Sequence, residues 1–476
     1  MSKTIIIIGA GLAGLSAALQ AAENGCNVKL VSSLPSERAQ SVMAEGGINA
    51  ALNTKDENDS PEEHFTDTIK AACGLADPNA VWGMTQAAPE LVHWLLKLGV
   101  KLNMSGYDDV DLRNFGGQKK KRTAFAQSDT GKQIMTAMID AVRRKEASGM
   151  VERFSHHSFL TLRLCGNICC GCVIRDEYSQ ETVELPGDAV IVATGGMHGL
   201  FGNTTGSLSN TGEVTAELFR LGVPLANGEM IQYHPTTVKC GGKRMLISEA
   251  ARGEGGRLFA MKDGKQWYFM EEKYPELGNL MPRDITAREI WKVSHESEVF
   301  LDMTEISEEI ISNKLSGLAD DCMTYLHKDI RKEPVSVLPG IHYFMGGILV
   351  DEQHRTPIQN LYAAGECCAQ YHGANRLGGN SLLGALYGGR VAAKSACEQA
   401  DVVDLSCATQ IDFPPASQIS EIKQLNKVMQ ETMGVVRNEN TLLNGIQTVQ
   451  ALTGNLPLLG MAVLKSALAR KESRGA

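Results

Sequence analysis

The first thirty residues contain three short hydrophobic segments with different periods. Residues 5–8 are an unbroken run of isoleucine, which is typical of a parallel strand buried on both faces. Residues 12–24 are rich in Ala and Leu at helical spacing and end before Gly25, where the helix should stop. Residues 27–31 then supply a second strand. The pattern predicts one strand–helix–strand unit with its glycines in the first turn.

The rest of the chain contains segments with helical spacing and segments with the alternation or short apolar runs of strands. Helical spacing recurs at 61–100, 128–149, 379–398 and 419–452, the last with a junction near 437–440. Residues 159–173 alternate around Gly166-Asn167, which predicts a β-hairpin. Residues 190–193 and 361–364 are short buried runs, and each leads into a glycine turn. Residues 228–339 are less regular, as in an inserted domain, and the Pro-, Ser- and Ala-rich residues 406–418 have the composition of a linker.

Composition narrows the class of protein. The chain has 476 residues, with 43% hydrophobic and 21% charged, so we expect several folded domains rather than disorder. The 46 basic and 55 acidic side chains give a net charge of −9, which argues against nucleic acid as a partner. We find no apolar run long enough to span a bilayer and no signal segment, and the twelve cysteines are scattered. We therefore expect a cytoplasmic protein without direct membrane insertion.

The sequence Gly9-Ala10-Gly11-Leu12-Ala13-Gly14 fits the pattern G-x-G-x-x-G between a predicted strand and a predicted helix. Glycines there let the backbone approach a pyrophosphate, whose charge the helix N-terminus stabilises. The acidic residue of a standard NAD site is missing, because Ser32 and Ser33 stand at the end of the second strand. A second glycine turn at 363–366 favours FAD, an extended dinucleotide. Glu366 then either binds a ribityl or ribose hydroxyl or is an ordinary surface carboxylate.

Seven ordered blocks of sequence resemble those of the succinate dehydrogenase/fumarate reductase flavoprotein subunits. L-Aspartate oxidases share much of the same set, so the resemblance identifies the family rather than the substrate. The blocks cover nearly the whole chain and are residues 41–51, 115–125, 232–236, 249–256, 282–284, 342–347 and 372–382.

The resemblance implies a fold. We expect an α/β protein with a Rossmann-like FAD-binding domain in two parts, an inserted α+β capping domain and a short helical C-terminal domain. The expected limits are 1–227 and 340–405 for the FAD-binding domain, 228–339 for the capping domain and 406–476 for the C-terminal domain.

The resemblance also implies residue roles. The activity would be reduction of fumarate to succinate, with a hydride from flavin N5 and a proton from Arg283. Arginine rarely deprotonates, so its chemistry alone suggests a carboxylate clamp, whereas the resemblance favours the acid, with Glu249 and Arg252 as its proton relay. The dicarboxylate-binding residues would be Phe125, His234, Ser248, His342 and Arg376, although Phe125 could instead be core packing. The FAD-binding residues would be Gly9, Ala10, Gly11, Gly14, Ser32, Ser33, Ala44, Gly46, Gly47, Thr194, Gly195, Glu213, Glu366, Arg376, Ser381 and Leu382.

Two features depart from the family. Gln40 stands where many respiratory members carry a flavin-linking histidine, so we expect noncovalent FAD and a preference for fumarate reduction. The chain also ends soon after residues 437–439, where respiratory members continue, which puts docking of an iron–sulfur or other electron-transfer subunit in doubt. Such a subunit would place the protein peripherally at the inner face of the membrane. The alternatives are an L-aspartate oxidase, a succinate dehydrogenase flavoprotein subunit, and a subunit with a structural or electron-relaying role.

Two other clusters are ambiguous. Cys165, Cys169, Cys170 and Cys172 lie along the predicted hairpin, where Cys169 and Cys170 should face opposite ways, so we expect no metal site. The basic run at 119–122 is either a solvated loop or an anion-docking loop.

Overall fold

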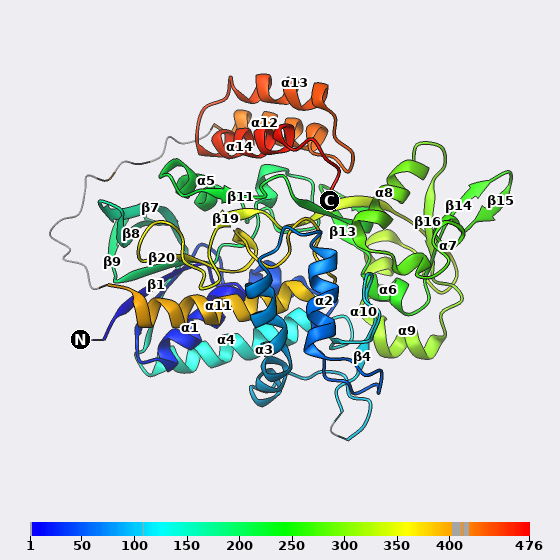
Figure 1. Ribbon diagram of the computed structural model, residues 1–476, viewed down its shortest axis with the longest axis horizontal. Helices are drawn as coiled ribbons and strands as arrows, with labels where there is room; N and C mark the ends of the chain where they lie inside the picture. Colours follow the sequence, from blue (N-terminus) through cyan, green and yellow to red (C-terminus); the bar gives the residue numbers. More distant parts are fainter. Residues whose placement is uncertain (1, 108, 402–410, 412, 414–417) are drawn as a thin grey trace.

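A computed structural model describes residues 2–107, 109–401, 411, 413 and 418–476 (Figure 1). The predicted linker at 406–418 lies largely outside the described residues. The sheets and helices together give the mixed α/β class expected from the sequence.

A five-stranded sheet forms the framework of one part of the fold. Its order is β20-β10-β1-β2-β6, and every neighbouring pair is parallel. The strands predicted near residues 5, 27, 190 and 361 are confirmed, because the sheet consists of β1 (Thr4–Ile8), β2 (Asn27–Ser32), β6 (Val151–Ser155), β10 (Ala189–Val192) and β20 (Leu361–Ala363). The isoleucine run at residues 5–8 forms the middle strand, and this buried position explains why the run is apolar on both faces.

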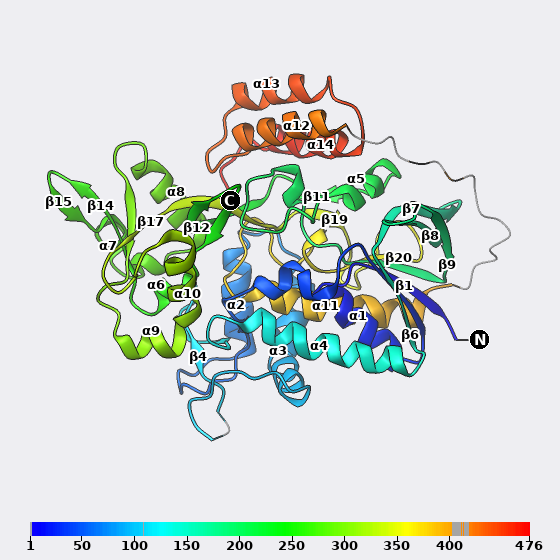
Figure 2. The same ribbon diagram turned by 180° about the vertical axis from the view of Figure 1, so that it is seen from behind.

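Helices cover one face of this sheet and a second sheet covers the other. The helices α1 (Leu12–Glu23), α4 (Thr130–Ala147) and α11 (Asn380–Gln399) share one apolar core with Ile5 and Ile7 (Figure 2). On the opposite face Ile6 and Ile8 pack with the predicted hairpin, now β7 (His157–Cys165) and β8 (Ile168–Asp176), and with β9 (Thr182–Pro186). Alternate residues of β1 enter the two apolar cores, so a shift of this strand by one residue would exchange its two faces.

The helical region at 61–100 is two helices rather than one. α2 (Pro61–Ala71) ends before Cys73 and Gly74, whose φ angles of 51° and 77° lie in the left-handed region. α3 (Pro78–Lys97) then begins at Asp77, whose carboxylate accepts hydrogen bonds from the amides of Asn79 and Ala80. The left-handed pair therefore reverses the chain between them.

Residues between 231 and 344 form two antiparallel sheets beside the parallel sheet. One contains β12 (Ile231–Cys240), β13 (Lys243–Leu246) and β18 (Leu338–Phe344). The other contains β14 (Arg257–Lys262), β15 (Lys265–Trp267), β16 (Val299–Asp302) and β17 (Val335–Ser336). With α6 (Glu249–Gly253), α8 (Arg283–Val293), α9 (Glu308–Lys314) and α10 (Ser316–Asp321) they bury a separate apolar core. The limit expected between 339 and 340 falls inside β18, and the domain limits stay predictions.

The last three helices form a layer at the top of Figure 1. They are α12 (Ile419–Thr432), α13 (Glu439–Val449) and α14 (Asn455–Ala469), and they pack over α5 (Glu213–Arg220). The junction expected near residues 437–440 is confirmed, since Asn438 caps α13 by accepting a hydrogen bond from the amide of Thr441. The helical spacing named at 419–452 stops short of α14, although α14 lies within the helical C-terminal domain expected at 406–476.

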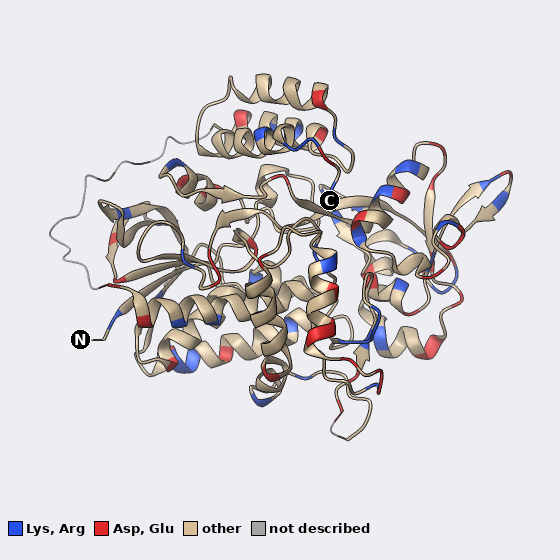
Figure 3. Cartoon of the chain, in the orientation of Figure 1, with Lys and Arg blue, Asp and Glu red and all other residues tan. Residues whose placement is uncertain are grey.

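Charged side chains are distributed over all parts of the fold. Figure 3 shows Lys and Arg interspersed with Asp and Glu rather than gathered on one element. Within the described ranges, no helix combines the length and apolar character needed to cross a bilayer.

Candidate active site

A cavity of about 940 Å³ lies at the carboxyl ends of the parallel strands. Loops that follow these strands are where open α/β sheets bind ligands. Most of the FAD-binding residues expected from the sequence line it, namely Gly9, Ala10, Gly11, Ser32, Ser33, Ala44, Gly46, Gly47, Thr194, Gly195, Glu213, Glu366, Arg376, Ser381 and Leu382. The remaining one, Gly14, does not line the cavity.

The first glycine motif has the geometry of a dinucleotide turn. A Cβ atom on Gly9 would lie 2.3 Å from the carbonyl oxygen of Ala193, and one on Gly14 would lie 1.8 Å from the carbonyl oxygen of Gly9. Gly14 therefore allows α1 to pack against the turn, while Gly9 and Gly11 expose backbone to the cavity. At the end of β2 the buried hydroxyl of Ser32 has no partner among the described residues. A ribose hydroxyl of FAD would satisfy it, so these residues fit the cofactor.

Glu366 faces the cavity rather than bulk solvent. Its Oε1 atom accepts a hydrogen bond of 3.1 Å from the amide of Phe344 and lies 3.6 Å from Nε2 of His198. This carboxylate is therefore available to a bound ligand, which supports the functional reading over an ordinary surface residue. Gln40 also lines the cavity, where its Oε1 atom accepts a hydrogen bond of 2.7 Å from the amide of Ser207.

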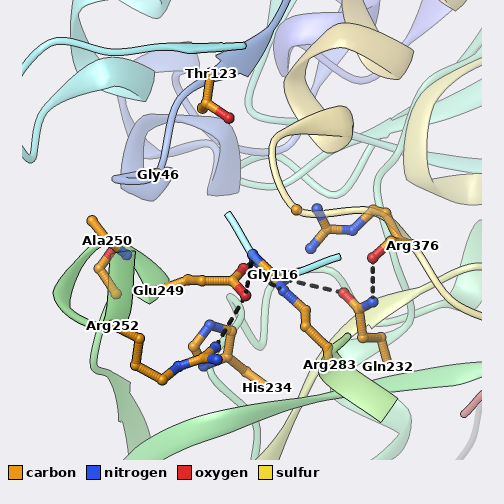
Figure 4. Close-up of polar contacts among 12 residues, drawn as sticks. Gly46, Gly116, Thr123, Gln232, His234, Glu249, Ala250, Arg252, Arg283 and Arg376 are labelled. Carbon is orange, nitrogen blue, oxygen red and sulfur yellow. Dashed lines mark hydrogen bonds and ion pairs between the residues drawn. The ribbon is translucent and has the colours of Figure 1, made fainter. Parts of the chain in front are cut away.

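Arg283, Glu249 and Arg252 form a continuous buried chain (Figure 4). Nη2 of Arg283 lies 2.6 Å from Oε2 of Glu249, and Nη2 of Arg252 lies 3.0 Å from Oε1 of the same carboxylate. Arg283 and Glu249 line the cavity, whereas Arg252 lies behind Glu249 and donates to the carbonyl oxygen of Asn279. The resemblance predicted these three residues as a set, and the structure brings them together.

Two of these three buried side chains stand at the first residue of a helix. Glu249 is the first residue of α6, whose N-cap Ser248 accepts a hydrogen bond from the amide of Ala250, and Arg283 is the first residue of α8 after Pro282. Burial alone would raise the pKa of Glu249, but Arg283 and Arg252 outweigh it and hold this pKa below its ordinary value. The carboxylate is therefore ionised between two cations.

Gln232 connects the two cavity arginines and was not singled out from the sequence. Its Oε1 atom accepts a hydrogen bond of 3.1 Å from Arg283, and its Nε2 atom donates one of 2.8 Å to the carbonyl oxygen of Arg376. A third bond of 3.0 Å reaches the amide oxygen of Asn375. The side chain is fully buried, so it holds both arginine segments in place.

Two histidines face each other from neighbouring strands. The rings of His234, on β12, and His342, on β18, have centroids 5.1 Å apart, and both line the cavity. Burial, followed by the positive charge of Arg283, lowers the pKa of each well below its ordinary value. Both rings are therefore neutral near pH 7 and would bind a carboxylate by hydrogen bonds. Thr205 was also missed from the sequence; its hydroxyl lies 2.8 Å from Nδ1 of His342.

Arg376 enters the cavity from the loop before α11. Its guanidinium carbon lies 4.3 Å from the centroid of the Tyr343 ring, and its buried Nε atom has no hydrogen-bond partner among the described residues. Burial, with the charge of Arg283, lowers the pKa of Arg376 to about 9. A cation held with an unsatisfied donor is suited to an anionic ligand.

The expectation that Phe125 packs over the substrate is not met, because Phe125 is absent from the cavity lining. It follows β5 (Thr123–Ala124), and its fully buried ring lies 4.2 Å from the guanidinium carbon of Arg113. Arg113 in turn donates a hydrogen bond of 3.0 Å to the carbonyl oxygen of Gly46. Phe125 therefore supports the loop that carries Gly46. Phe115 does line the cavity; it lies within a block that the sequence identified but is a residue it did not select.

The two ambiguous clusters have structural explanations. In the basic run, Lys120 donates to the carbonyl oxygen of Asn58, and the fully buried Arg122 pairs with Asp59 at 2.9 Å and Asp67 at 3.0 Å. In the hairpin, Cys169 and Cys172 pack in the core between the two sheets. Over the part of the chain that the structure describes, no three side chains of metal-binding type gather in one place.

The fold and the cavity define an FAD-binding oxidoreductase. Residues 4–382 match the protein family described as FAD binding domain. The chain belongs to the succinate dehydrogenase/fumarate reductase family of flavoproteins, and its cofactor is FAD.

Three similar proteins illustrate the range of this family. The succinate dehydrogenase flavoprotein subunit of Bacillus subtilis is 40% identical over 466 residues, which cover 96% of this chain and 79% of that protein. L-Aspartate oxidase of Caulobacter vibrioides is 35% identical, with 99% and 91% covered. The solved structure of a mutant FrdA from E. coli quinol fumarate reductase superposes with a TM-score of 0.90 at 27% identity, covering 100% of this chain and 90% of that one. The recognition of the family from its sequence blocks is thus confirmed.

Proposed function

We propose that this protein reduces fumarate to succinate and that Arg283 delivers the proton. The observation that carries the proposal is the chain Arg283–Glu249–Arg252, which begins at the cavity wall and continues into the protein interior. A chain of this kind can replace a proton that its first member has given away. A buried residue that served only as a carboxylate clamp would need a counter-charge such as Glu249, but not a second cation behind that carboxylate.

The remaining cavity groups suit a substrate with two carboxylates. Arg376 supplies a charge-assisted hydrogen bond, and His234, His342 and Ser248 supply neutral ones, all from the lining of the cavity. Bound FAD supplies the hydride that reaches one alkene carbon. Arg283 protonates the neighbouring carbon, and the proton is replaced through Glu249 from Arg252. Arg252 must then take up one proton from solvent, which restores the charge of the buried chain after each turnover.

A proton leaves an arginine only if the deprotonated form is stabilised at that moment. The two charged groups beside Arg283 act in opposite directions. The carboxylate of Glu249 stabilises the protonated form of Arg283, whereas the positive charge of Arg376 destabilises it. The proton therefore moves in concert with arrival of the hydride, when negative charge develops on the substrate carbon. Arg252 makes this exchange possible because it binds the other oxygen of the same carboxylate at 3.0 Å.

The site chemistry also supports fumarate rather than aspartate as the proposed substrate. An amino-acid substrate carries an ammonium group, which requires an acceptor beside the reacting carbon. Glu249 is already engaged by two arginines and by the amide of Gly116, and the apolar ring of Phe115 lines the cavity as well. This arrangement favours a dicarboxylate without an amine. Fumarate turnover measured against aspartate-dependent peroxide formation separates the two activities.

The decisive experiment compares Arg283→Ala and Arg283→Lys with Arg376→Ala. If Arg283 is the acid, both Arg283 variants still bind fumarate, seen as a perturbed flavin spectrum, while turnover falls by at least about 10²–10⁴-fold. Arg376→Ala should instead lose binding, by on the order of 1.5–3 kcal/mol in kcat/KM. Substantial turnover in Arg283→Ala would end the acid assignment. Lost binding with a normal kcat would make Arg283 a clamp.

We further propose that FAD is held noncovalently, because Gln40 offers an amide where a linking side chain would stand, and this amide is engaged by Ser207. Denaturation by acid should release all of the flavin into the supernatant, and flavin fluorescence that stays with the denatured band on a gel contradicts the proposal.

The natural reductant is proposed to be an electron-transfer subunit, because the Bacillus relative is named a flavoprotein subunit. Iron that copurifies with the chain in its native complex tests this point.

A further inference from the structure

Two cysteines far apart in the sequence have their sulfur atoms together. Cys26 lies in the turn before β2, Cys397 lies near the end of α11, and their Sγ atoms are 2.9 Å apart. Cys26 belongs to the apolar core beneath the parallel sheet, and Cys397 packs against it. Neither residue lines the cavity, and the proposed reaction uses neither. We propose that Cys26 and Cys397 are a modification site that forms a reversible disulfide on exposure to peroxide.

The surroundings of the pair differ from those of an ordinary core cysteine. Residues 23–25 and 398–399 are exposed, so the thiols lie directly beneath the surface, and Cys397 itself is only partly buried. Lys3 fixes this end of α11 by donating a hydrogen bond of 2.8 Å to the carbonyl oxygen of Cys397. A disulfide holds its sulfurs about 2.05 Å apart, so the thiols must approach by less than about 1 Å. Burial raises the pKa of the Cys397 thiol to about 12, so its oxidation should be slow. Cys397 is only partly buried, however, and its partner is already in place.

The reaction balances with hydrogen peroxide as the oxidant. Peroxide oxidises the sulfur of Cys397 to a sulfenic acid and releases one water. The sulfur of Cys26 then attacks that sulfur, a sulfur–sulfur bond forms, and the sulfenic oxygen leaves as a second water. Two thiols and one peroxide thus give one disulfide and two waters, with two electrons passing from sulfur to oxygen. A dithiol reductant reverses the step.

The position of the pair indicates what the disulfide would change. Ser381 and Leu382, at the opposite end of α11, line the cavity, roughly 24 Å from Cys397 at 1.5 Å per residue. Ser32 and Ser33 likewise lie at the opposite end of β2 from Cys26. The link would join the helix layer to the sheet at the end remote from the cavity. It would therefore stabilise the fold without altering turnover.

The test uses the FAD-loaded protein before and after treatment with hydrogen peroxide. A digest made without reductant should contain the Cys26 peptide joined to the Cys397 peptide, and dithiothreitol should separate them. The oxidised wild type should unfold on the order of 3–10 °C higher than the reduced form, with unchanged fumarate turnover. Cys26→Ser and Cys397→Ser should each abolish both the joined peptide and the rise in Tm, whereas Cys73→Ser should keep them.

Two results would overturn the proposal. One is recovery of Cys26 and Cys397 as separately alkylated peptides after peroxide treatment. The other is a rise in Tm that persists in the Cys26→Ser/Cys397→Ser double variant. The first measurement needs no variant, so it stays decisive even if a substitution prevents folding.

Discussion

At the scale of single residues, Thr205 holds the ring of His342 through a hydrogen bond at one nitrogen. Its hydroxyl lies 2.8 Å from Nδ1 of the ring and 3.3 Å from the carbonyl oxygen of Ile341. For His342 to donate to a carboxylate through Nε2, the hydroxyl must donate to Nδ1. The neutral ring is then a hydrogen-bond donor on its other side, as binding of a carboxylate requires.

Replacing Thr205 by Val should therefore weaken substrate binding without removing His342. We expect KM for fumarate to rise about 5- to 10-fold, the equivalent of one net hydrogen bond, with a smaller change in kcat. Thr205→Ser keeps the hydroxyl and is the matched control, which should remain close to the wild type. A loss in Thr205→Ser with none in Thr205→Val would show that the methyl group, not the hydroxyl, matters.

Glu45 is a second residue whose environment has a measurable consequence. Burial, aided by Asp321 and Asp129 and opposed by Arg113, raises the pKa of Glu45 to about 8. The folded protein thus keeps a proton that the unfolded chain releases near pH 4.5. Stability should consequently fall as the pH rises from about 4.5 to about 8, by at most roughly 1.4 kcal/mol per pH unit.

Glu45→Gln cannot ionise and should escape this loss. We expect its Tm to exceed that of the wild type by several degrees at pH 8 and to approach the wild-type value at pH 5. Glu152→Gln changes an exposed carboxylate and serves as the control, with little effect at either pH. A Glu45→Gln protein whose Tm advantage does not depend on pH would show that ionisation of Glu45 is not responsible.

The sequence located the charged site residues better than their neighbours. Arg283, Glu249 and Arg376 could be found because each stands in a recognisable block, and the buried chain bears out their proximity. Gln232, Thr205 and Phe115 could not be selected, because their importance depends on what they contact rather than on their residue type. Phe125 was misplaced for the same reason, since the sequence does not show that its ring lies beneath Arg113.

At the scale of elements, two helices cross with their backbones in contact. α1 and α11 pack face to face, and a Cβ atom on Gly389 of α11 would lie 2.3 Å from the carbonyl oxygen of Ala13 in α1. No side-chain rotation relieves a clash with backbone, so the helices would have to separate. Both helices also contribute to the wall of the cofactor cavity, because Leu12 of α1 and Ser381 of α11 line it.

Gly389→Ala should therefore lower Tm and weaken retention of FAD together. A destabilisation of about 1–3 kcal/mol is typical for overpacking, and FAD loss on dilution reports the shift of the two helices. Gly434→Ala is the control, because its nearest neighbour would lie 3.7 Å from the added atom. Normal Tm and FAD retention in Gly389→Ala would contradict the close crossing.

The sequence predicted elements best where the period was strong and the boundary residue was Gly or Pro. The isoleucine strand and the hairpin at Gly166-Asn167 are of this kind. The break between α2 and α3 was missed, because only the structure shows that Cys73 takes a left-handed conformation. α14 lies within the expected helical C-terminal domain but was not singled out, because the sequence does not show that its apolar residues pack against Leu425 and Met429 of α12.

At the scale of the whole molecule, a buried carboxylate attaches the C-terminal helices to the rest of the fold. Glu229 is 2% exposed, lies 2.6 Å from Nε of Arg470, and accepts a hydrogen bond from Ser466 of α14. Its backbone carbonyl accepts a hydrogen bond of 2.8 Å from Arg437. Although burial opposes ionisation, Ser466 and Arg470 lower the pKa of Glu229 below its ordinary value. The ion pair thus stabilises the fold above about pH 4.5 and less as Glu229 becomes protonated.

Arg470→Ala should leave this carboxylate without its cation. We expect a loss of about 1–3 kcal/mol of stability at pH 7, less than for a fully buried pair because Arg470 is partly exposed. The difference from the wild type should shrink as the pH falls through the pKa of Glu229. Lys471→Ala removes the neighbouring exposed ion pair with Glu439 and should have little effect. Equal losses in the two variants would contradict a special role for Glu229.

Gln232 joins parts of the molecule that are far apart in the sequence. It lies on β12, it binds the start of α8 through Arg283, and it binds the loop before α11 through the carbonyl of Arg376. The segments that carry the two arginines are therefore held in place by the protein before any substrate arrives. In the proposed reaction Arg376 binds a carboxylate and Arg283 delivers the proton, so Gln232 helps to set where the proton donor stands relative to a bound diacid. Through this single buried amide, a diacid of the wrong length would lose turnover more than binding.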